Sequence, residues 1–131
     1  MFSLSLSMNK MNKEFVPYQP SLDMKEIGFD EPCFGYHLDN KFQFFADVRS
    51  CNTNSEFGFY PTAPTFSQAF RWFREKHDLC GIVLPFGEGL FDYRIYSAKE
   101  GKHLFGSPEF KTYEEAKLYC LIKLIEIVKN K

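Results

Sequence analysis

The chain has 131 residues, a length typical of one domain, and its 44% hydrophobic and 25% charged residues are the composition of a globular protein. Sixteen Lys and Arg residues nearly balance 17 Asp and Glu, and the formal net charge of −1 excludes nonspecific binding of nucleic acid or anionic membranes through overall charge. Sixteen Phe and seven Tyr accompany a single Trp. Because each aromatic side chain buries about 150–250 Å², this content is large for one small core.

Residues 1–13 have little periodicity and predict a flexible leader, followed by a single ordered domain over residues 14–131. The leader lacks the basic region and cleavage site of an export signal, and no apolar run approaches the length of a membrane span. The four cysteines form no CxxC pair and have no histidine at zinc spacing. We therefore expect a cytoplasmic protein with reduced structural thiols, no metal site and no cofactor.

The first half of the domain contains one short helix and one hairpin by its sequence pattern. Residues 21–27 are compatible with a helix, because a glycine that can end it follows directly. The aromatic-rich segments 33–38 and 41–48 are separated by an Asp-Asn pair and predict a β-hairpin. Residues 49–64 are rich in turn formers and predict a loop.

The second half begins with the clearest helix signal, a capping box at Thr65–Gln68. The apolar residues that follow at helical spacing predict a stripe packed on a sheet: Phe66, Ala69, Phe70, Phe73 and His77. Residues 80–86 and 90–97 predict a second hairpin around a glycine-containing turn, and a third short strand is expected near 103–105. A second capping box begins a last helix, expected over residues 112–129.

Antiparallel strands interrupted by helices, without βαβ alternation, predict an α+β fold. We expect a two-layer sandwich with one antiparallel sheet of four to five strands, two main helices and a short N-terminal helix. The order helix, strands, helix is also similar to the topology of a double-stranded RNA-binding domain, which grips phosphates with lysines at the start of its last helix. Here Glu114 and Glu115 occupy the matching turn and would repel phosphate.

Several separated stretches carry a resemblance that covers nearly all of the chain after the leader. They are Phe15–Tyr18, Gly28–Pro32, Pro64–Lys76, Thr112–Lys117 and Leu121–Lys129. Together they resemble a family of small uncharacterised proteins encoded by phages and prophages of Bacteroidetes. The family has no assigned activity, so the resemblance implies a phage or prophage setting, with the host cytoplasm as the compartment, and transfers no functional residues.

The sequence contains no nucleophile elbow, phosphate-binding loop, dinucleotide fingerprint or metalloprotease motif, so we expect a protein that is not an enzyme. The candidate ligand- or partner-binding residues are Arg and aromatic: Tyr60, Arg71, Trp72, Arg74 and Arg94. Exposed Trp and Arg are enriched in interaction hot spots, and Arg also recognises phosphate. The alternative for the middle helix is a solvated face on which Trp72 covers the edge of the core.

The aromatic-rich loop at 57–60 is a second place for a binding site, or else it folds back on the core. Our first hypothesis is an accessory protein that binds a host or phage protein during infection or counter-defence. The first alternative is a small-ligand binder that sequesters a nucleotide or signalling molecule through the Arg and aromatic residues. A nucleic-acid-binding domain is a further alternative, disfavoured by the charge balance.

The last helix predicts a homodimer, because its apolar arc is wider than one sheet face can cover. Ala116, Cys120, Leu124 and Ile127 form the stripe expected to face the sheet. The arc extends beyond this stripe through the interface candidates Leu118, Leu121, Ile122, Ile125 and Val128. We expect these residues to contribute to an isologous interface.

Overall fold

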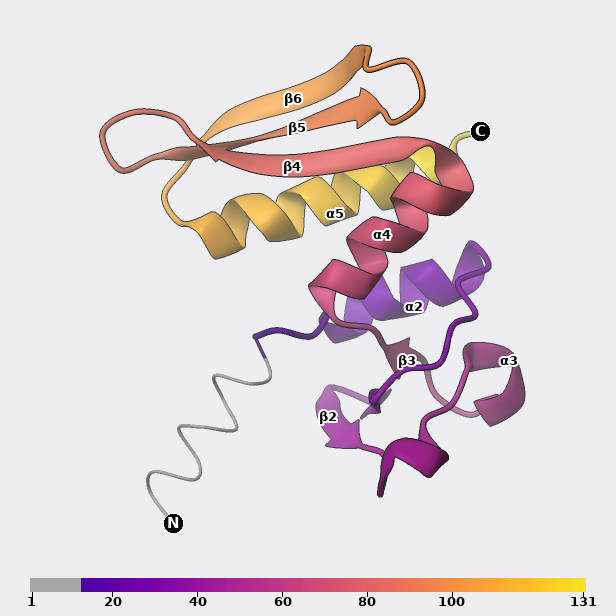
Figure 1. Cartoon of the computed structure of the whole chain (residues 1–131). Coiled ribbons are helices and arrows are strands. Elements are labelled where there is room, and N and C mark those ends of the chain that lie inside the picture. The colour runs from indigo at the N-terminus through magenta and orange to yellow at the C-terminus, as the bar shows by residue number, and fades with distance from the viewer. Residues whose placement is uncertain (1–12) are drawn as a thin grey trace. The chain divides into compact units, whose positions relative to one another are not determined.

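The computed structural model describes residues 13–131 and divides the chain into two compact units (Figure 1). Unit 1 extends to Gln68, and unit 2 comprises Ala69–Lys131. The predicted leader lies outside the described residues, except for Lys13. The single-domain prediction for residues 14–131 stays a prediction, and each unit is described by itself.

Unit 1 is built on a small antiparallel sheet with strand order β2–β1–β3. Its elements are α2 (Tyr18–Glu26), β1 (Gly35–Leu38), β2 (Lys41–Phe44), the 3₁₀ turn η1 (Val48–Ser50), α3 (Asn54–Phe57) and β3 (Thr62–Ala63). The predicted first hairpin is confirmed, with Gly35 opposite Phe44 and Leu38 opposite Lys41. Asp39 takes a φ of 55° in the turn, a conformation that Asp tolerates better than most residues.

Helix α2 begins earlier than its sequence predicts, because Pro20 lies inside its first turn. A helix leaves its first amides without an intrahelical acceptor, so a residue without an N–H is tolerated there. The first α-helical hydrogen bond of α2 runs from the Ser21 N–H to the Pro17 carbonyl, 3.0 Å. Gly28 follows the helix with a φ of 98°, as expected for a residue that ends a helix.

The predicted loop at 49–64 contains η1, α3 and β3. Thr53 caps α3, and its Oγ1 accepts a hydrogen bond from the Glu56 N–H at 3.1 Å. Gly58 ends the helix in the left-handed region with a φ of 78°. Asp30, 25 residues earlier, accepts a further hydrogen bond from the Ser55 N–H at 2.7 Å. This part of the cap comes from a remote residue, so a local sequence pattern does not reveal it.

Unit 2 is one antiparallel sheet with strand order β4–β5–β6 and helix α5 along one face (Figure 1). Its elements are β4 (Leu79–Pro85), β5 (Phe91–Ser97), β6 (His103–Phe110) and α5 (Tyr113–Lys129). Helix α4 (Phe66–His77) leads into β4, and the boundary between the units falls inside it. Gly81 allows the close approach of β4 and α5, since a Cβ there would lie 2.8 Å from Cys120 Sγ.

The α+β class is confirmed, but the strands are divided differently from the prediction. Six strands form two three-stranded sheets in the described residues, rather than one sheet of four to five strands. The additional strand is β3, whose two residues complete the sheet of the first hairpin. Strand β6 is the third short strand expected near 103–105, and it runs past Phe105 to Phe110. Strand β6 includes Pro108, which an edge strand tolerates because one side of its backbone is unpaired.

In both predicted capping boxes, the threonine side chain accepts a hydrogen bond from the backbone N–H three residues later. Thr65 Oγ1 accepts from the Gln68 N–H at 3.1 Å, and Thr112 Oγ1 accepts from the Glu115 N–H at 3.0 Å. The Gln68 side chain donates to the Pro32 carbonyl at 2.8 Å instead of closing its capping box. In the described part of the chain, no helix is long and apolar enough to cross a membrane.

Candidate functional site: an exposed aromatic surface

Unit 1 carries a continuous cluster of aromatic rings, here called the aromatic surface. It consists of Tyr36, Phe45, Phe57, Phe59 and Tyr60. Phe57 lies at its centre, with its ring centroid 4.8 Å from Tyr36, 5.1 Å from Phe45 and 6.1 Å from Phe59. Phe59 is 83% exposed and Tyr60 is 37% exposed. The cluster therefore has a half-buried base and an exposed rim.

Three backbone elements bring these rings together. Tyr36 comes from β1, Phe45 follows β2, and Phe57 ends α3. The left-handed backbone at Gly58 then turns the chain so that Phe59 and Tyr60 continue the cluster. Sequence reasoning identified the loop at 57–60 as a candidate but not Tyr36 and Phe45, which belong to the hairpin. The aromatic content of the hairpin was the available signal.

Buried polar groups hold the segment that carries Phe57. Asn54 donates from Nδ2 to the Phe29 carbonyl and accepts at Oδ1 from the Thr62 N–H, both at 2.8 Å. These bonds tie α3 to the chain on both sides of it in sequence. The aromatic rings are thus presented by a segment with fixed backbone partners, which lowers the entropy lost when such a surface binds.

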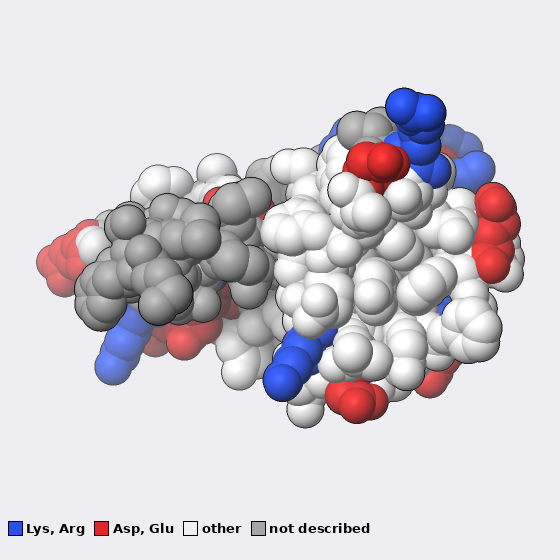
Figure 2. Space-filling model, turned by 90° about the horizontal axis from the view of Figure 1, so that it is seen from below, with Lys and Arg blue, Asp and Glu red and all other residues white. Residues whose placement is uncertain are grey.

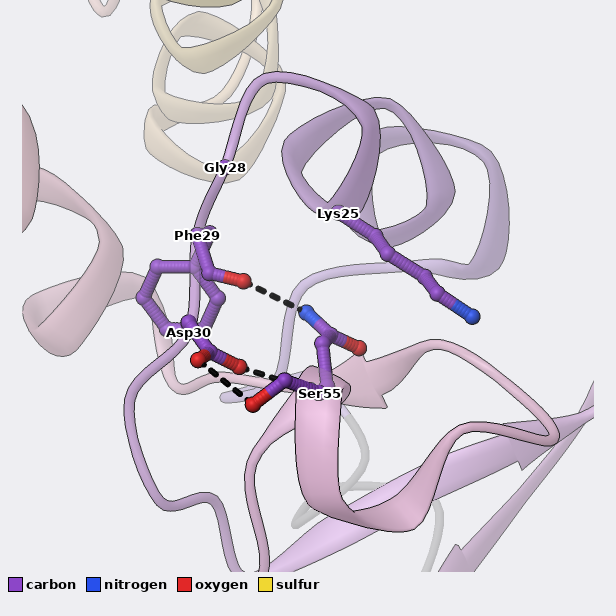
Figure 3. A pocket seen from close by; sticks show the side chains of 6 residues that line it. Lys25, Gly28, Phe29, Asp30 and Ser55 are labelled. Carbon is purple, nitrogen blue, oxygen red and sulfur yellow. Dashed lines mark hydrogen bonds between the residues drawn. The ribbon is translucent and has the colours of Figure 1, made fainter.

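An open pocket of about 320 Å³ lies beside α3 and is lined by Lys25, Gly28, Phe29, Asp30, Asn54 and Ser55 (Figure 3). Both carboxylate oxygens of Asp30 accept hydrogen bonds from Ser55, one from its N–H and one from its hydroxyl, each at 2.7 Å. These bonds favour the charged form and lower the pKa of Asp30. The Lys25 side chain points away from Asp30 (Figure 3). The polar groups of Asp30 and Asn54 that line this pocket therefore have a structural role, because their hydrogen bonds hold α3 in place.

On one face of the molecule, charged side chains lie around an uncharged area rather than across it (Figure 2). Seen from below the view of Figure 1, uncharged side chains form a broad area there, and Lys, Arg, Asp and Glu lie at its margin (Figure 2). Protein interfaces are also depleted in charge at their centre and polar at their rim.

The other predicted binding residues lie in unit 2, whereas Tyr60 lies in unit 1. Trp72 is 5% exposed and packs against Phe73 and His77, with ring centroids at 5.0 and 4.8 Å. This position agrees with the alternative in which Trp72 covers the core.

The predicted arginines keep exposed or half-exposed side chains. Arg71 and Arg74 are exposed on α4, and Arg71 Nε lies 3.8 Å from Glu75 Oε1. Arg94 on β5 donates from Nε to Asp92 Oδ2 at 3.2 Å. Arg94 and Arg71 therefore each lie beside a carboxylate that offsets their charge.

The predicted interface residues of α5 have unequal exposure. Leu121 and Ile125 are buried within the chain. Leu118 and Val128 are half-buried, and Ile122 is exposed. The part of the predicted arc that is most available to a partner is therefore Ile122, next to the exposed Tyr119 on the same helix.

All four cysteines are free. Burial raises the pKa of the Cys33 and Cys120 thiols to about 12, so these thiols are protonated and unreactive at neutral pH. No group of three or more His, Cys, Asp and Glu side chains in the described range 13–131 could hold a metal ion.

Comparisons with family models, with curated proteins and with solved structures give no match to this chain.

Proposed function

We propose that the chain is a non-enzymatic binding protein that docks on a partner protein through its aromatic surface. The observation that carries the proposal is the contiguity of five aromatic side chains with Phe59 83% exposed. Full burial of an exposed Phe side chain against a partner contributes about 1.5–3 kcal/mol to the free energy of binding. Aromatic residues are also the side chains most enriched at interface centres.

The proposed setting is a phage or prophage, and the proposed partner is a host or phage protein met in the host cytoplasm during infection or counter-defence. The support for this setting is the resemblance of the separated segments described above. The support for a protein as the partner is the exposure of Phe59 and Tyr60 at the rim of the cluster, because aromatic side chains are enriched at the centres of protein interfaces.

The two alternatives have weaker support. A nucleotide site built from Arg71, Trp72 and Arg94 would need an available indole ring and unpaired guanidinium groups. The Trp72 ring is buried, and Arg71 and Arg94 lie beside Glu75 and Asp92. A nucleic-acid site would need cations among the aromatic rings, because phosphate contacts supply most of the affinity of such sites.

The test compares Phe59→Ser with Phe86→Ser. Each variant removes one exposed Phe from a turn, Phe59 in the aromatic surface and Phe86, 43% exposed, in the β4–β5 turn of unit 2. The immobilised wild-type protein is used to isolate a partner from host lysate, and affinities are then measured with the purified partner.

We expect Phe59→Ser to raise the dissociation constant about 30-fold, because one hot-spot side chain is lost. We expect Phe86→Ser to leave the dissociation constant unchanged. Equal affinity of wild type and Phe59→Ser would remove the aromatic surface from the proposal. Loss of binding in both variants would indicate an effect on folding or a different surface.

A further inference from the structure

Strand β4 is an edge of the sheet in unit 2, and it pairs with β5 alone. Its register is regular over its whole length, from Leu79 opposite Ser97 to Pro85 opposite Phe91. In an antiparallel pair, every second residue of a strand bonds to the neighbouring strand. The backbone bonds at the two ends of β4 show which residues bond to β5: Ala98 N–H donates to the Asp78 carbonyl and Phe86 N–H to the Leu90 carbonyl. Even-numbered residues of β4 therefore bond to β5.

The odd-numbered residues consequently direct their N–H and C=O groups away from the sheet. Gly81 and Val83 are the central ones, and within the described chain their N–H groups have no hydrogen-bond partner. Both residues are partly accessible to solvent. An antiparallel strand placed beside β4 would satisfy these groups in pairs.

The other edge of the same sheet is protected against such pairing. Strand β6 has two irregularities in its register with β5, contains Pro108 and places Glu109 at a φ of 74°. Prolines, bulges and charged residues are the devices that prevent sheets from joining edge to edge. Strand β4 has none of them before its last residue, Pro85: its sequence is Leu-Cys-Gly-Ile-Val-Leu, without a charge.

We propose that β4 pairs with β4 of a second copy of this chain, antiparallel and centred on Ile82, so that the two sheets join into one of six strands. This register places Leu79 opposite Pro85 of the second copy at each end of the pairing, where one hydrogen bond is missing because Pro85 has no N–H. It places Gly81 opposite Val83 of the second copy as a pair that exchanges both hydrogen bonds.

The absence of charge on β4 favours a second copy as the occupant. A twofold axis brings each residue near the axis opposite itself or its close neighbours, so a charged strand would repel its own copy. Ile82 faces away from α5, because Gly81 faces Cys120 and successive side chains alternate. It is 36% exposed in the single chain and would lie against Ile82 of the second copy at the closely spaced, non-hydrogen-bonded position.

This surface is independent of the aromatic surface, and its test leaves that surface unchanged. The variant Ile82→Lys places two like charges directly opposite each other at the twofold axis. The matched control is Leu104→Lys on β6, because Leu104 is 38% exposed on the same sheet and the same charge is added. Sedimentation equilibrium gives the mass of each protein, and circular dichroism shows whether each is folded.

We expect the full-length wild type and Leu104→Lys to be dimeric at about 100 μM, and Ile82→Lys to raise the dimer dissociation constant about tenfold or more. An equimolar mixture of Ile82→Lys and Ile82→Glu restores a dimer, because opposite charges then meet at the axis. A monomeric wild type at this concentration overturns the proposal. So does a dimer that Ile82→Lys leaves intact, or one that Leu104→Lys alone disrupts.

A measurement on the unmodified protein keeps the proposal testable if the Ile82 variants do not fold. Amide hydrogen exchange at Gly81 and Val83 becomes slower as protein concentration rises from about 1 to about 100 μM, since pairing closes these N–H groups. Exchange at the backbone amides of β6 stays constant over the same range. Equal, concentration-independent exchange at both edges contradicts the pairing.

Discussion

At the residue scale, the contact between Gly81 and Cys120 sets how closely β4 and α5 approach. A Cβ at position 81 would lie 2.8 Å from Cys120 Sγ, 3.0 Å from a ring carbon of Phe70 and 3.2 Å from Leu124 Cδ1. We expect Gly81→Ala to lower the free energy of unfolding by about 1–3 kcal/mol through overpacking. Urea denaturation measures the loss.

A double-mutant cycle isolates the cause of that loss. Cys120→Ala removes the sulfur atom that the new Cβ meets first, so Gly81→Ala should cost less in this background than in the wild type. Equal costs in both backgrounds would assign the effect to the backbone of β4 instead. The inward position of Cys120 is also the one that helix periodicity predicts, and its burial confirms that prediction.

His37 makes the stability of unit 1 depend on pH. It is buried, and one ring nitrogen, Nε2, lies 2.8 Å from the Val16 carbonyl oxygen, so this nitrogen donates. Within the described residues its Nδ1 is buried without a hydrogen-bond partner. Burial lowers the pKa of His37 below its usual value of 6.5. The folded protein therefore binds a proton at this site less readily than the unfolded chain does.

The sign of the pH effect follows from this difference. The unfolded chain takes up more protons below pH 6.5, so the free energy of unfolding decreases as the pH falls below this value. Burial lowers the pKa of His77 too, so it contributes in the same direction. Urea denaturation at pH 7.5 and 5.5 measures how much the free energy of unfolding falls between these two values. We expect this decrease to be smaller for His37→Gln than for wild type. His103→Gln, at an exposed position, is the control. An unchanged loss in His37→Gln would contradict the assignment.

At the element scale, α3 depends on Asp30, which accepts two hydrogen bonds from Ser55. We expect Asp30→Ala to destabilise the protein by about 0.5–2 kcal/mol, the usual cost of losing a helix cap. Because α3 carries Phe57, limited proteolysis should also cut faster near Gly58. Asp47→Ala is the control, since Asp47 accepts its bonds from Arg49 and Ser50 within η1. Equal cleavage rates in the two variants would contradict the role of Asp30.

The elements that local patterns predict are those whose signals lie within the element. The caps at Thr65 and Thr112 and the first hairpin are of this kind, and the structure confirms them. Helix α3 is not, because Asp30 and Asn54 tie it to distant parts of the chain. The same holds for the aromatic surface. Its loop at 57–60 could be predicted as a candidate from the sequence, whereas the contacts of Tyr36 and Phe45 with that loop depend on the fold of unit 1.

At the scale of the whole molecule, the first contacts of the described chain begin just after the predicted leader. The Glu14 carbonyl accepts from the Phe66 N–H at 3.0 Å, and Val16 N–H donates to the Pro64 carbonyl at 2.9 Å. We expect a chain that begins at Met11 to keep these contacts and to melt cooperatively, within about 0.5 kcal/mol of the full chain. Loss of a cooperative melt would show that residues 1–10 contribute to the fold.

Because the boundary between the two units falls inside α4, the chain cannot be cut there into two fragments without dividing this helix. Phe66–Gln68 belong to unit 1 and Ala69–His77 to unit 2, although all of them form one helix that starts from the Thr65 cap. A cut at the boundary would leave one fragment with a single unfinished turn and the other with a helix that has lost its capped start. We therefore expect that neither unit folds as a portable module when the chain is cut at this boundary.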